Sequence, residues 1–245
     1  MPKTLDNPRS SRHAKRSEER PALHRLIEND LIRRVSYGEY RDKVRRAYSG
    51  PKGALLSLAS MLSLHIPMGE RVFRRRKFDL QGVKSVLDIG SGAGQLAGHV
   101  LKYGEADVQV TCMDLSAKML ERARIRLHSP RPRFVAADLA QLPFADGSFD
   151  CITCGYVLEH LPNAEPGLAE MARVLERGGR MFLLCTEDTF SGAWTSRLWL
   201  CRTHNRADLR KMCEQHGLEW RQEIWFTRLH KTFRAGGICV EIVKR

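Results

Sequence analysis

The chain has 245 residues, of which 42% are hydrophobic, and its formal net charge is +13 at pH 7. This length and apolar fraction suit one domain with extensions around a single core, and no apolar run reaches the roughly 20 residues that cross a bilayer. The chain start lacks the apolar segment of a secretory signal, and the seven cysteines are scattered without the spacing of a small disulfide scaffold. We therefore expect a cytoplasmic protein.

The first third of the chain is expected to hold a basic tail and a helical cap. Residues 1–20 contain almost no large apolar side chains, so we expect them to be disordered, because they bury too little surface to offset the entropy of ordering. Residues 21–81 are expected to be mainly helical, since apolar side chains recur there at helical spacing. Residues 54–66 are predicted to form a nearly all-apolar helix that ends at Pro67. A basic cluster follows it, formed by Arg71, Arg74, Arg75, Arg76 and Lys77.

Residues 82–245 are expected to alternate strands with helices, which predicts an α/β domain with a mostly parallel sheet. In such sheets, ligands bind at the carboxyl ends of the strands. The last two strands are expected to form an antiparallel hairpin, because the turn residues 234–237 lie near their junction. The seven predicted strands lie near residues 85–89, 108–113, 133–136, 149–154, 180–186, 219–226 and 238–243.

A glycine turn directly follows the first of these strands. Gly90, Gly92 and Gly94 remove Cβ atoms where the backbone must bend sharply and approach a ligand. The helix expected from Gln95 to Tyr103 begins with free amides that favour electron-rich groups. The spacing differs from the dinucleotide fingerprint Gly-x-Gly-x-x-Gly, whose third glycine would fall at Gln95. We expect a nucleotide-like ligand at this turn.

Acidic residues stand at the ends of three successive predicted strands. Asp88 lies in the apolar end of the first, where a buried carboxylate is costly unless it accepts hydrogen bonds locally or from a ligand. Asp114 ends the second and can accept from both hydroxyls of a ribose, since a carboxylate has two oxygens. Asp138 and Leu139 follow the third, and they offer an acceptor for an exocyclic amine beside an apolar face for a ring.

From about Val83 to Arg180, this order of elements resembles the class I S-adenosylmethionine-dependent methyltransferases, most closely their small-molecule group, which includes the quinone-biosynthesis enzymes. Residues 142–150, followed by Leu158-Glu159-His160-Leu161, look like the fourth-strand motif of that family. The resemblance implies a Rossmann-like seven-stranded sheet, with a C-terminal antiparallel hairpin and N-terminal helices that cap the cofactor. It also implies that the glycine loop faces the methionine part of S-adenosylmethionine, that Asp114 binds its ribose, and that Asp138 and Leu139 bind its adenine. The residues expected to bind the cofactor are Asp88, Gly90, Ser91, Gly92, Gly94, Asp114, Leu115, Asp138, Leu139 and Gly155.

Methyl transfer requires mainly alignment, because the sulfonium carbon is already electrophilic. A base is needed only if the accepting atom loses a proton during attack. His160, just after the fourth strand, is the candidate base, and its alternative is a partly buried structural histidine. Glu159 is expected to be a positioning residue or a solvated helix charge, and Tyr156 to pack under the cofactor or to line the pocket.

One pattern of metal-ligand residues is present near the C-terminus. Two Cys-x-x-His pairs there carry the thiolate and imidazole groups that bind zinc. However, residues 206–216 have the pattern of an amphipathic helix with Leu209, Met212 and Cys213 on its buried face, so no metal is predicted. The four residues in question are Cys201, His204, Cys213 and His216.

The positive charge favours an acidic partner or surface. RNA is one candidate, because lysine and arginine neutralise phosphates. An anionic membrane is another candidate, since an apolar helix beside a basic cluster can lie in the membrane interface. The third interpretation is that the helix is a lid over the pocket and the arginines are solvated. We expect transfer to a small, apolar or lipid-like acceptor, with peripheral contact to an anionic membrane. An RNA methyltransferase and a non-catalytic cofactor-binding protein remain the alternatives.

Overall fold

The structure is a computed structural model that describes residues 38–39, 42, 46, 65–199, 201–232 and 237–245. The predicted tail over residues 1–20 and most of the predicted helical cap, up to residue 64, lie outside the described residues. Among the residues that are described, no helix is both long and apolar enough to span a membrane.

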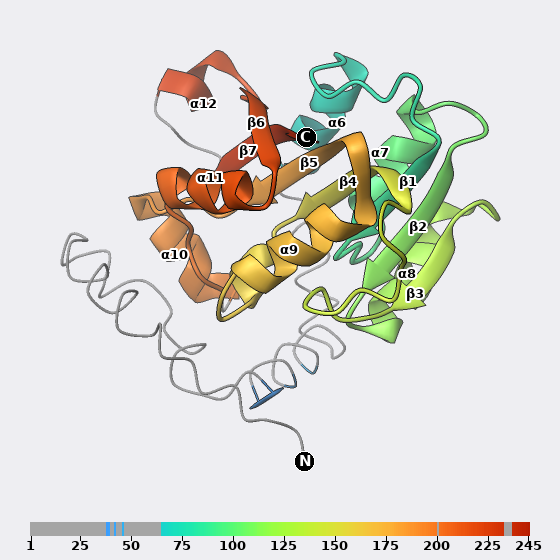
Figure 1. Ribbon diagram of the computed structural model, residues 1–245, viewed down its shortest axis with the longest axis horizontal. Helices are drawn as coiled ribbons and strands as arrows, with labels where there is room; N and C mark the ends of the chain where they lie inside the picture. Colours follow the sequence, from blue (N-terminus) through green and yellow to red (C-terminus); the bar gives the residue numbers. More distant parts are fainter. Residues whose placement is uncertain (1–37, 40–41, 43–45, 47–64, 200, 233–236) are drawn as a thin grey trace.

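A seven-stranded sheet forms the centre of the described chain, in the order β3-β2-β1-β4-β5-β7-β6 (Figure 1). The five strands from β3 to β5 are parallel, and β7 runs antiparallel to both β5 and β6. This confirms the predicted α/β fold with its antiparallel C-terminal strands. The strands are β1 (Ser85–Ile89), β2 (Gln109–Asp114), β3 (Arg133–Ala136), β4 (Phe149–Gly155), β5 (Leu175–Cys185), β6 (Leu218–Glu223) and β7 (Ile238–Lys244).

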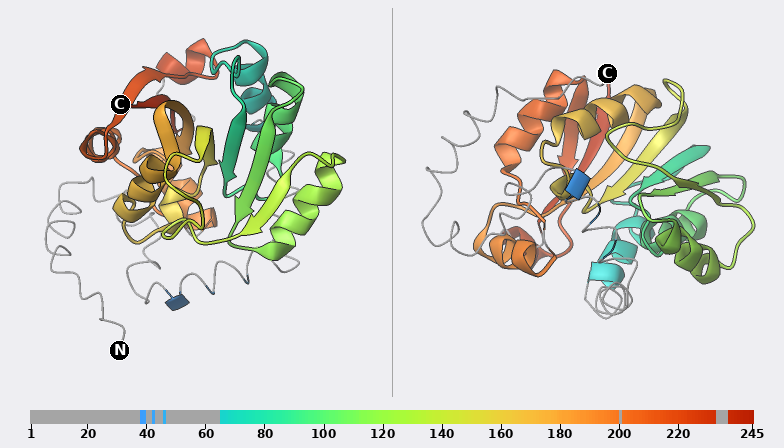
Figure 2. Two further views of the ribbon diagram at one scale, coloured as in Figure 1. Left: turned by 45° about the vertical axis from the view of Figure 1, so that its right-hand side comes forward. Right: turned by 90° about the horizontal axis from the view of Figure 1, so that it is seen from below.

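Helices cover both faces of the sheet, as the two views of Figure 2 show. On one face, Leu168 of α9 and Leu209 of α11 pack into a core with alternate residues of the strands. On the other face, Phe73 of α6, Val100 of α7 and Leu120 of α8 pack into a second core. The helices are α6 (His65–Arg74), α7 (Gln95–Tyr103), α8 (Ala117–Leu127), α9 (Glu165–Val174), α10 (Phe190–Trp199), α11 (Arg206–Gln215) and α12 (Arg228–Thr232), with a 3₁₀ turn, η1 (Leu158–His160).

Three predicted boundaries were wrong. Pro67 lies within α6 and does not end a helix, since the described helix runs on from it to Arg74. β5 begins at Leu175 and not near residue 180, since this buried residue already pairs with Phe149 of β4. β6 ends at Glu223 and α12 follows it, because Ile224 and Phe226 turn into the core.

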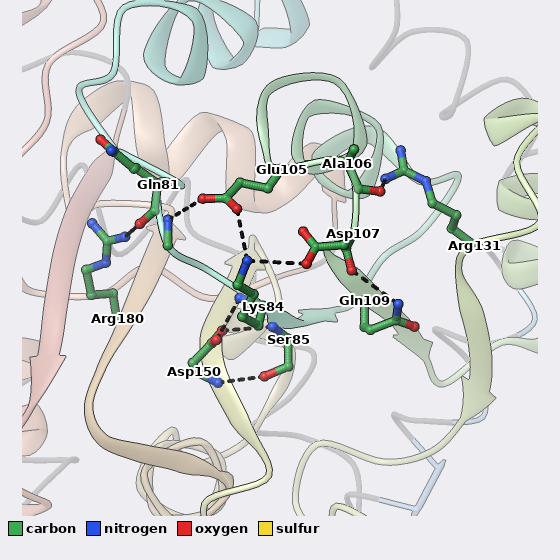
Figure 3. Close-up of polar contacts among 11 residues, drawn as sticks. Gln81, Lys84, Ser85, Glu105, Ala106, Asp107, Gln109, Arg131, Asp150 and Arg180 are labelled. Atoms are coloured by element: carbon green, nitrogen blue, oxygen red, sulfur yellow. Dashed lines mark hydrogen bonds and ion pairs between the residues drawn. The ribbon is translucent and has the colours of Figure 1, made fainter.

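Polar contacts hold together the edge of the sheet where β1 and β4 begin (Figure 3). The carboxylate of Asp150 accepts from the amides of Lys84 and Ser85 at 2.7 and 3.0 Å. Lys84 Nζ in turn lies 2.9 Å from Glu105 Oε2 and 3.3 Å from Asp107 Oδ2. The opposite edge, where the parallel strands end, carries the predicted site residues.

Candidate active site

The carboxyl ends of β1, β2 and β4 lie side by side. Ile89, the last residue of β1, pairs with Met113 on one side and with Cys154 on the other. The glycine loop that follows β1 is tied to β2, since the Ser91 amide donates to the Met113 carbonyl at 2.9 Å. The sheet register therefore brings the glycine loop, Asp114 and Gly155 to one edge.

Backbone conformation explains the Gly-x-Gly-x-Gly spacing. Gly90, Gly92 and Gly94 have φ values of +63°, +54° and +80°, in the left-handed region that residues with a Cβ rarely adopt. Gly90 is also sterically restricted, because a Cβ there would lie 2.1 Å from Cγ2 of Val157. Gly94 is the N-cap of α7, so the loop leads directly into the first turn of a helix.

Asp88 is buried beneath this loop and accepts three hydrogen bonds. Its Oδ2 accepts from Ser91 Oγ at 2.6 Å and from the Ala97 amide at 3.2 Å, and its Oδ1 accepts from Thr153 Oγ1 at 2.7 Å. Burial raises the pKa of Asp88 from 3.8 to about 6, against these three hydrogen bonds, which lower it. Asp88 thus connects the glycine loop to the start of α7 and to β4. Its carboxylate accepts hydrogen bonds from protein groups and needs no ligand to offset the cost of its burial.

Asp114 is half-buried and organises the adjacent turn. Its Oδ2 accepts from the Gly92 amide at 2.9 Å and its Oδ1 from the Ser116 amide at 2.8 Å. Burial raises the pKa of this carboxyl, while the two amides lower it. Each carboxylate oxygen has two acceptor sites, so both keep one for a ligand hydroxyl. The neighbouring Leu115 is half-buried as well.

Asp138 and Leu139 follow β3, next to Asp114. The Ala137 amide donates to the Asp114 carbonyl at 3.1 Å, which places the chain after β3 beside the end of β2. Asp138 Oδ1 accepts from the Ala140 amide at 2.9 Å and so shapes the turn. Leu139 is 4% exposed and packs into the core near Gly167 of α9, so most of its apolar surface contacts protein.

The backbone after β4 bends sharply. Tyr156 has a φ of +59°, which is uncommon for a residue with a side chain, and its amide donates to the Leu184 carbonyl at 2.9 Å. Gly155 precedes it, and a Cβ there would lie 3.0 Å from Leu96 of α7. Val157 then packs against Gly90, so the loop after β4 and the glycine loop restrict each other's conformation.

His160 ends the 3₁₀ turn η1 that follows Val157. The side chain is half-buried, and loss of hydration lowers its pKa from 6.5 to about 4. The imidazole is therefore neutral at physiological pH, and one of its two nitrogens is unprotonated. This protonation state is the one that a proton acceptor requires, although the low pKa makes it a weak base.

Glu159 is buried, so of the two interpretations given for it, the solvated helix charge was wrong. Its side chain is 1% exposed, and Oε1 accepts from the hydroxyl and the amide of Thr186, just after β5, at 2.8 and 3.2 Å. Within the described residues, Oε2 has no hydrogen-bond partner. Burial raises the pKa of Glu159 to about 7. Its backbone carbonyl accepts from the Arg202 amide at 3.0 Å, so Glu159 joins the ends of β4 and β5 to the segment before α11.

The sequence motifs predicted the residues of the loop but missed those that support it. Thr153 supports Asp88, Val157 packs against Gly90, and Thr186 holds Glu159. None belongs to a glycine or acidic motif. The signal that could have found them is strand register, because Thr153 is the direct neighbour of Asp88 across β1 and β4.

The four Cys and His residues near the C-terminus do not form a metal centre in the structure. Within the described ranges, no group of three or more His, Cys, Asp or Glu side chains is arranged to hold a metal ion. Cys213 is buried in α11 beside Leu209, as the helical pattern predicts. His204 forms an isolated bridge with Glu187 beyond β5.

Comparisons with known proteins agree with this geometry. A family model described as "Methyltransferase domain" matches residues 87–183. The ubiquinone/menaquinone biosynthesis C-methyltransferase UbiE of Geobacter sp. (strain M21) is 34% identical over 131 residues, which are 52% of this chain and 56% of that protein. The enzyme of the same name from Pseudomonas fluorescens (strain SBW25) is 36% identical over 121 residues, 46% of this chain and 47% of its own. The chain thus spans about half the length of these curated relatives.

Solved structures of methyltransferases share the fold. The mitomycin 7-O-methyltransferase MmcR has a TM-score of 0.68 at 19% identity, over 98% of this chain and 69% of its own. The magnesium protoporphyrin IX methyltransferase ChlM from Synechocystis PCC 6803, with bound SAH, has a TM-score of 0.58 at 23% identity, over 74% of this chain and 84% of its own. The family match, the sheet order and the glycine loop together confirm the predicted family and its cofactor, S-adenosylmethionine. Residues 87–183 therefore belong to a class I S-adenosylmethionine-dependent methyltransferase domain, similar in sequence to the small-molecule group that acts in quinone biosynthesis.

Proposed function

We propose that this protein transfers a methyl group from S-adenosylmethionine to a small, apolar or lipid-like acceptor. The observation that carries the proposal is the glycine loop, which is held in a left-handed conformation against Asp114 by the 2.9 Å bond from the Gly92 amide. The names of the similar C-methyltransferases support a small acceptor, since ubiquinone and menaquinone are apolar molecules.

The residues at this edge fit the cofactor. Three of the five residues from Gly90 to Gly94 lack a Cβ atom, and α7 begins directly after them, so an electron-rich ligand can approach the backbone closely. Asp114 keeps acceptor sites for ribose hydroxyls, and Asp138, beside it, can accept from an exocyclic amine. When bound, S-adenosylmethionine supplies an electrophilic methyl group that is already activated for in-line attack.

His160 is proposed as the proton acceptor for substrates that lose a proton during attack. Its lowered pKa keeps the imidazole neutral, and its place after Val157 puts it in the loop that packs on the glycine turn. Glu159 and Tyr156 are proposed to position this loop, because Glu159 bonds to Thr186 and Tyr156 to the backbone of β5. Alignment by these contacts is expected to supply most of the rate.

The test is transfer of labelled methyl from S-adenosylmethionine into an extract of the source cells, with products separated into organic, RNA and protein fractions. Label in the organic fraction, lost in Asp114→Ala, is the expected result. Label in RNA would replace this proposal with the RNA methyltransferase, which the net charge of +13 favours. Measurable cofactor binding without any label in extracts from several growth conditions would support the non-catalytic alternative.

A further inference from the structure

A basic cleft lies away from the cofactor edge. Its volume is about 440 Å³, and it is lined by side chains from the segment that follows α6, from β5, from β6 and from β7. Arg180 of β5 pairs with Cys151, two residues after β4 begins, whereas the glycine loop packs where β1, β2 and β4 end. Figure 3 shows Arg180 beside Gln81, in the same close-up as Lys84, at the edge where the parallel strands begin. The cleft is therefore separate from the methyl-transfer site.

Positive charge dominates this cleft. Four cations, Arg76, Lys77, Arg180 and Arg221, line it together with two carboxylates, Asp79 and Glu241. Glu241 is 5% exposed and accepts from the side-chain amide of Gln222, which also lines the cleft. In the part of the chain that the structure describes, none of the four cations forms an ion pair. Their charges are left to solvent or to a ligand.

Two of the cations are held in place by the core. The guanidinium of Arg180 lies over the ring of buried Phe78, 5.8 Å from its centroid, and donates to the Gln81 carbonyl at 3.3 Å. Lys77 donates to the backbone carbonyl of Trp225, and two of its three donors remain available. Burial lowers the pKa of Lys77, and the charges of Arg71 and Arg75 lower it further. A bound anion would relieve this crowding of positive charge.

The other two cations stand at irregular points of the backbone. Arg76 has a φ of +50°, unusual for a residue with a side chain, in the turn that ends α6. Arg221 is the extra residue of a β-bulge, since Trp220 and Gln222 pair with the consecutive residues Ile242 and Glu241 of β7. Bulges redirect side chains, and they are frequent at binding sites. Both irregularities bring an arginine into the same cleft.

We propose that this cleft binds a phosphate-bearing anion, either a soluble diphosphate or the headgroup of an anionic phospholipid. Planar guanidinium groups match phosphate oxygens with two parallel hydrogen bonds, and a lysine adds a point charge. The volume is within the range of small-ligand sites. A single-stranded nucleic acid fits less well, because such sites use exposed aromatic rings as stacking platforms and Phe78, the ring beneath Arg180, is fully buried.

Calorimetric titration of the full chain with inorganic pyrophosphate tests the proposal. We expect saturable binding that weakens about a hundredfold or more in the double variant Arg76→Gln/Arg180→Gln, because two charge-assisted hydrogen bonds to the anion are lost. Arg210→Gln is the matched control, since this exposed arginine of α11 is paired with Glu214 at 3.0 Å and lies outside the cleft. It should bind pyrophosphate like the wild type, and S-adenosylmethionine binding should stay unchanged in all variants.

Vesicles distinguish the two sources of phosphate. Binding to phosphatidic acid in phosphatidylcholine, competed by pyrophosphate and absent from phosphatidylcholine alone, identifies the lipid headgroup. Pyrophosphate binding without vesicle binding identifies a soluble ligand. The proposal is overturned if pyrophosphate does not bind, if Arg210→Gln weakens binding as much as the double variant, or if an RNA oligonucleotide binds without competition by pyrophosphate. Should the double variant fail to fold, Arg221→Gln alone decides, because that side chain is exposed and forms no hydrogen bond or ion pair with another described residue.

Discussion

The titration of buried Glu159 is expected to be visible in the stability of the whole protein. Its pKa is raised by burial from 4.5 to about 7. The folded state therefore binds this proton more tightly than the unfolded state. The contribution of Glu159 to the free energy of unfolding is fully present below pH 4.5 and is lost as the pH rises towards 7. At about 1.4 kcal/mol for each pKa unit, the loss amounts to about 3 kcal/mol.

The substitution Glu159→Gln removes this titration and keeps the shape of the side chain. The amide oxygen can still accept from Thr186, and the amide nitrogen replaces Oε2, which has no hydrogen-bond partner among the described residues. We expect the stability advantage of the wild type over the variant to shrink by about 3 kcal/mol between pH 4.5 and pH 7.5. Asp88 also titrates with a raised pKa, but it is present in both proteins and cancels in the difference.

Urea unfolding of both proteins at four pH values between 4.5 and 7.5 measures this difference. Glu170→Gln is the control, because Arg173 holds the pKa of Glu170 below its ordinary value. That carboxylate contributes stability that is present above its unfolded pKa and is lost only at lower pH, so its difference from the wild type should stay nearly constant between pH 4.5 and pH 7.5. A wild-type advantage over Glu159→Gln that is constant with pH would refute the reasoning.

Three further predictions concern the site. Asp114→Ala is expected to weaken S-adenosylmethionine binding by about 1–3 kcal/mol, because ribose hydroxyls lose charged acceptors; calorimetry that finds wild-type affinity would remove Asp114 from the site. His160→Ala is expected to lower kcat while the Kd of the cofactor is unchanged, and the wild-type rate should be independent of this imidazole above about pH 5, since its pKa is about 4; a normal kcat in the variant would make His160 structural. Gly90→Ala is expected to destabilise the protein by more than Gly82→Ala, because both have positive φ but only Gly90 meets Val157, at 2.1 Å; thermal unfolding compares the two, and equal losses would contradict the steric argument.

The motif residues and the order of elements could be predicted from sequence because their causes are local. Gly90, Gly92 and Gly94 are required by backbone dihedrals that a side chain would oppose, and these dihedrals are found in the structure. The alternation of apolar strands and amphipathic helices predicted the sheet. The places where prediction failed, such as Pro67 and the start of β5 at Leu175, are boundaries where tertiary contacts override local preference.

Burial and pairing between distant segments could not be predicted in the same way. Glu159 has the sequence pattern of a surface helix charge, yet it is 1% exposed because Thr186, 27 residues later, supplies its hydrogen bonds. The basic cleft likewise needs the β-bulge at Arg221 to face Arg76 and Arg180.

By itself, the sequence determined the fold class, the glycine loop and the acids at the carboxyl ends of β1, β2 and β3, since these depend on dihedral preference, hydrophobic period and the chemistry of single residues. Only the tertiary structure decided which polar groups are buried, which hydroxyls support Asp88, and which arginines share a cleft. Burial, pKa and charge clustering depend on the distances between side chains that are far apart in the sequence. Those distances are set only when the strands pair in their final register.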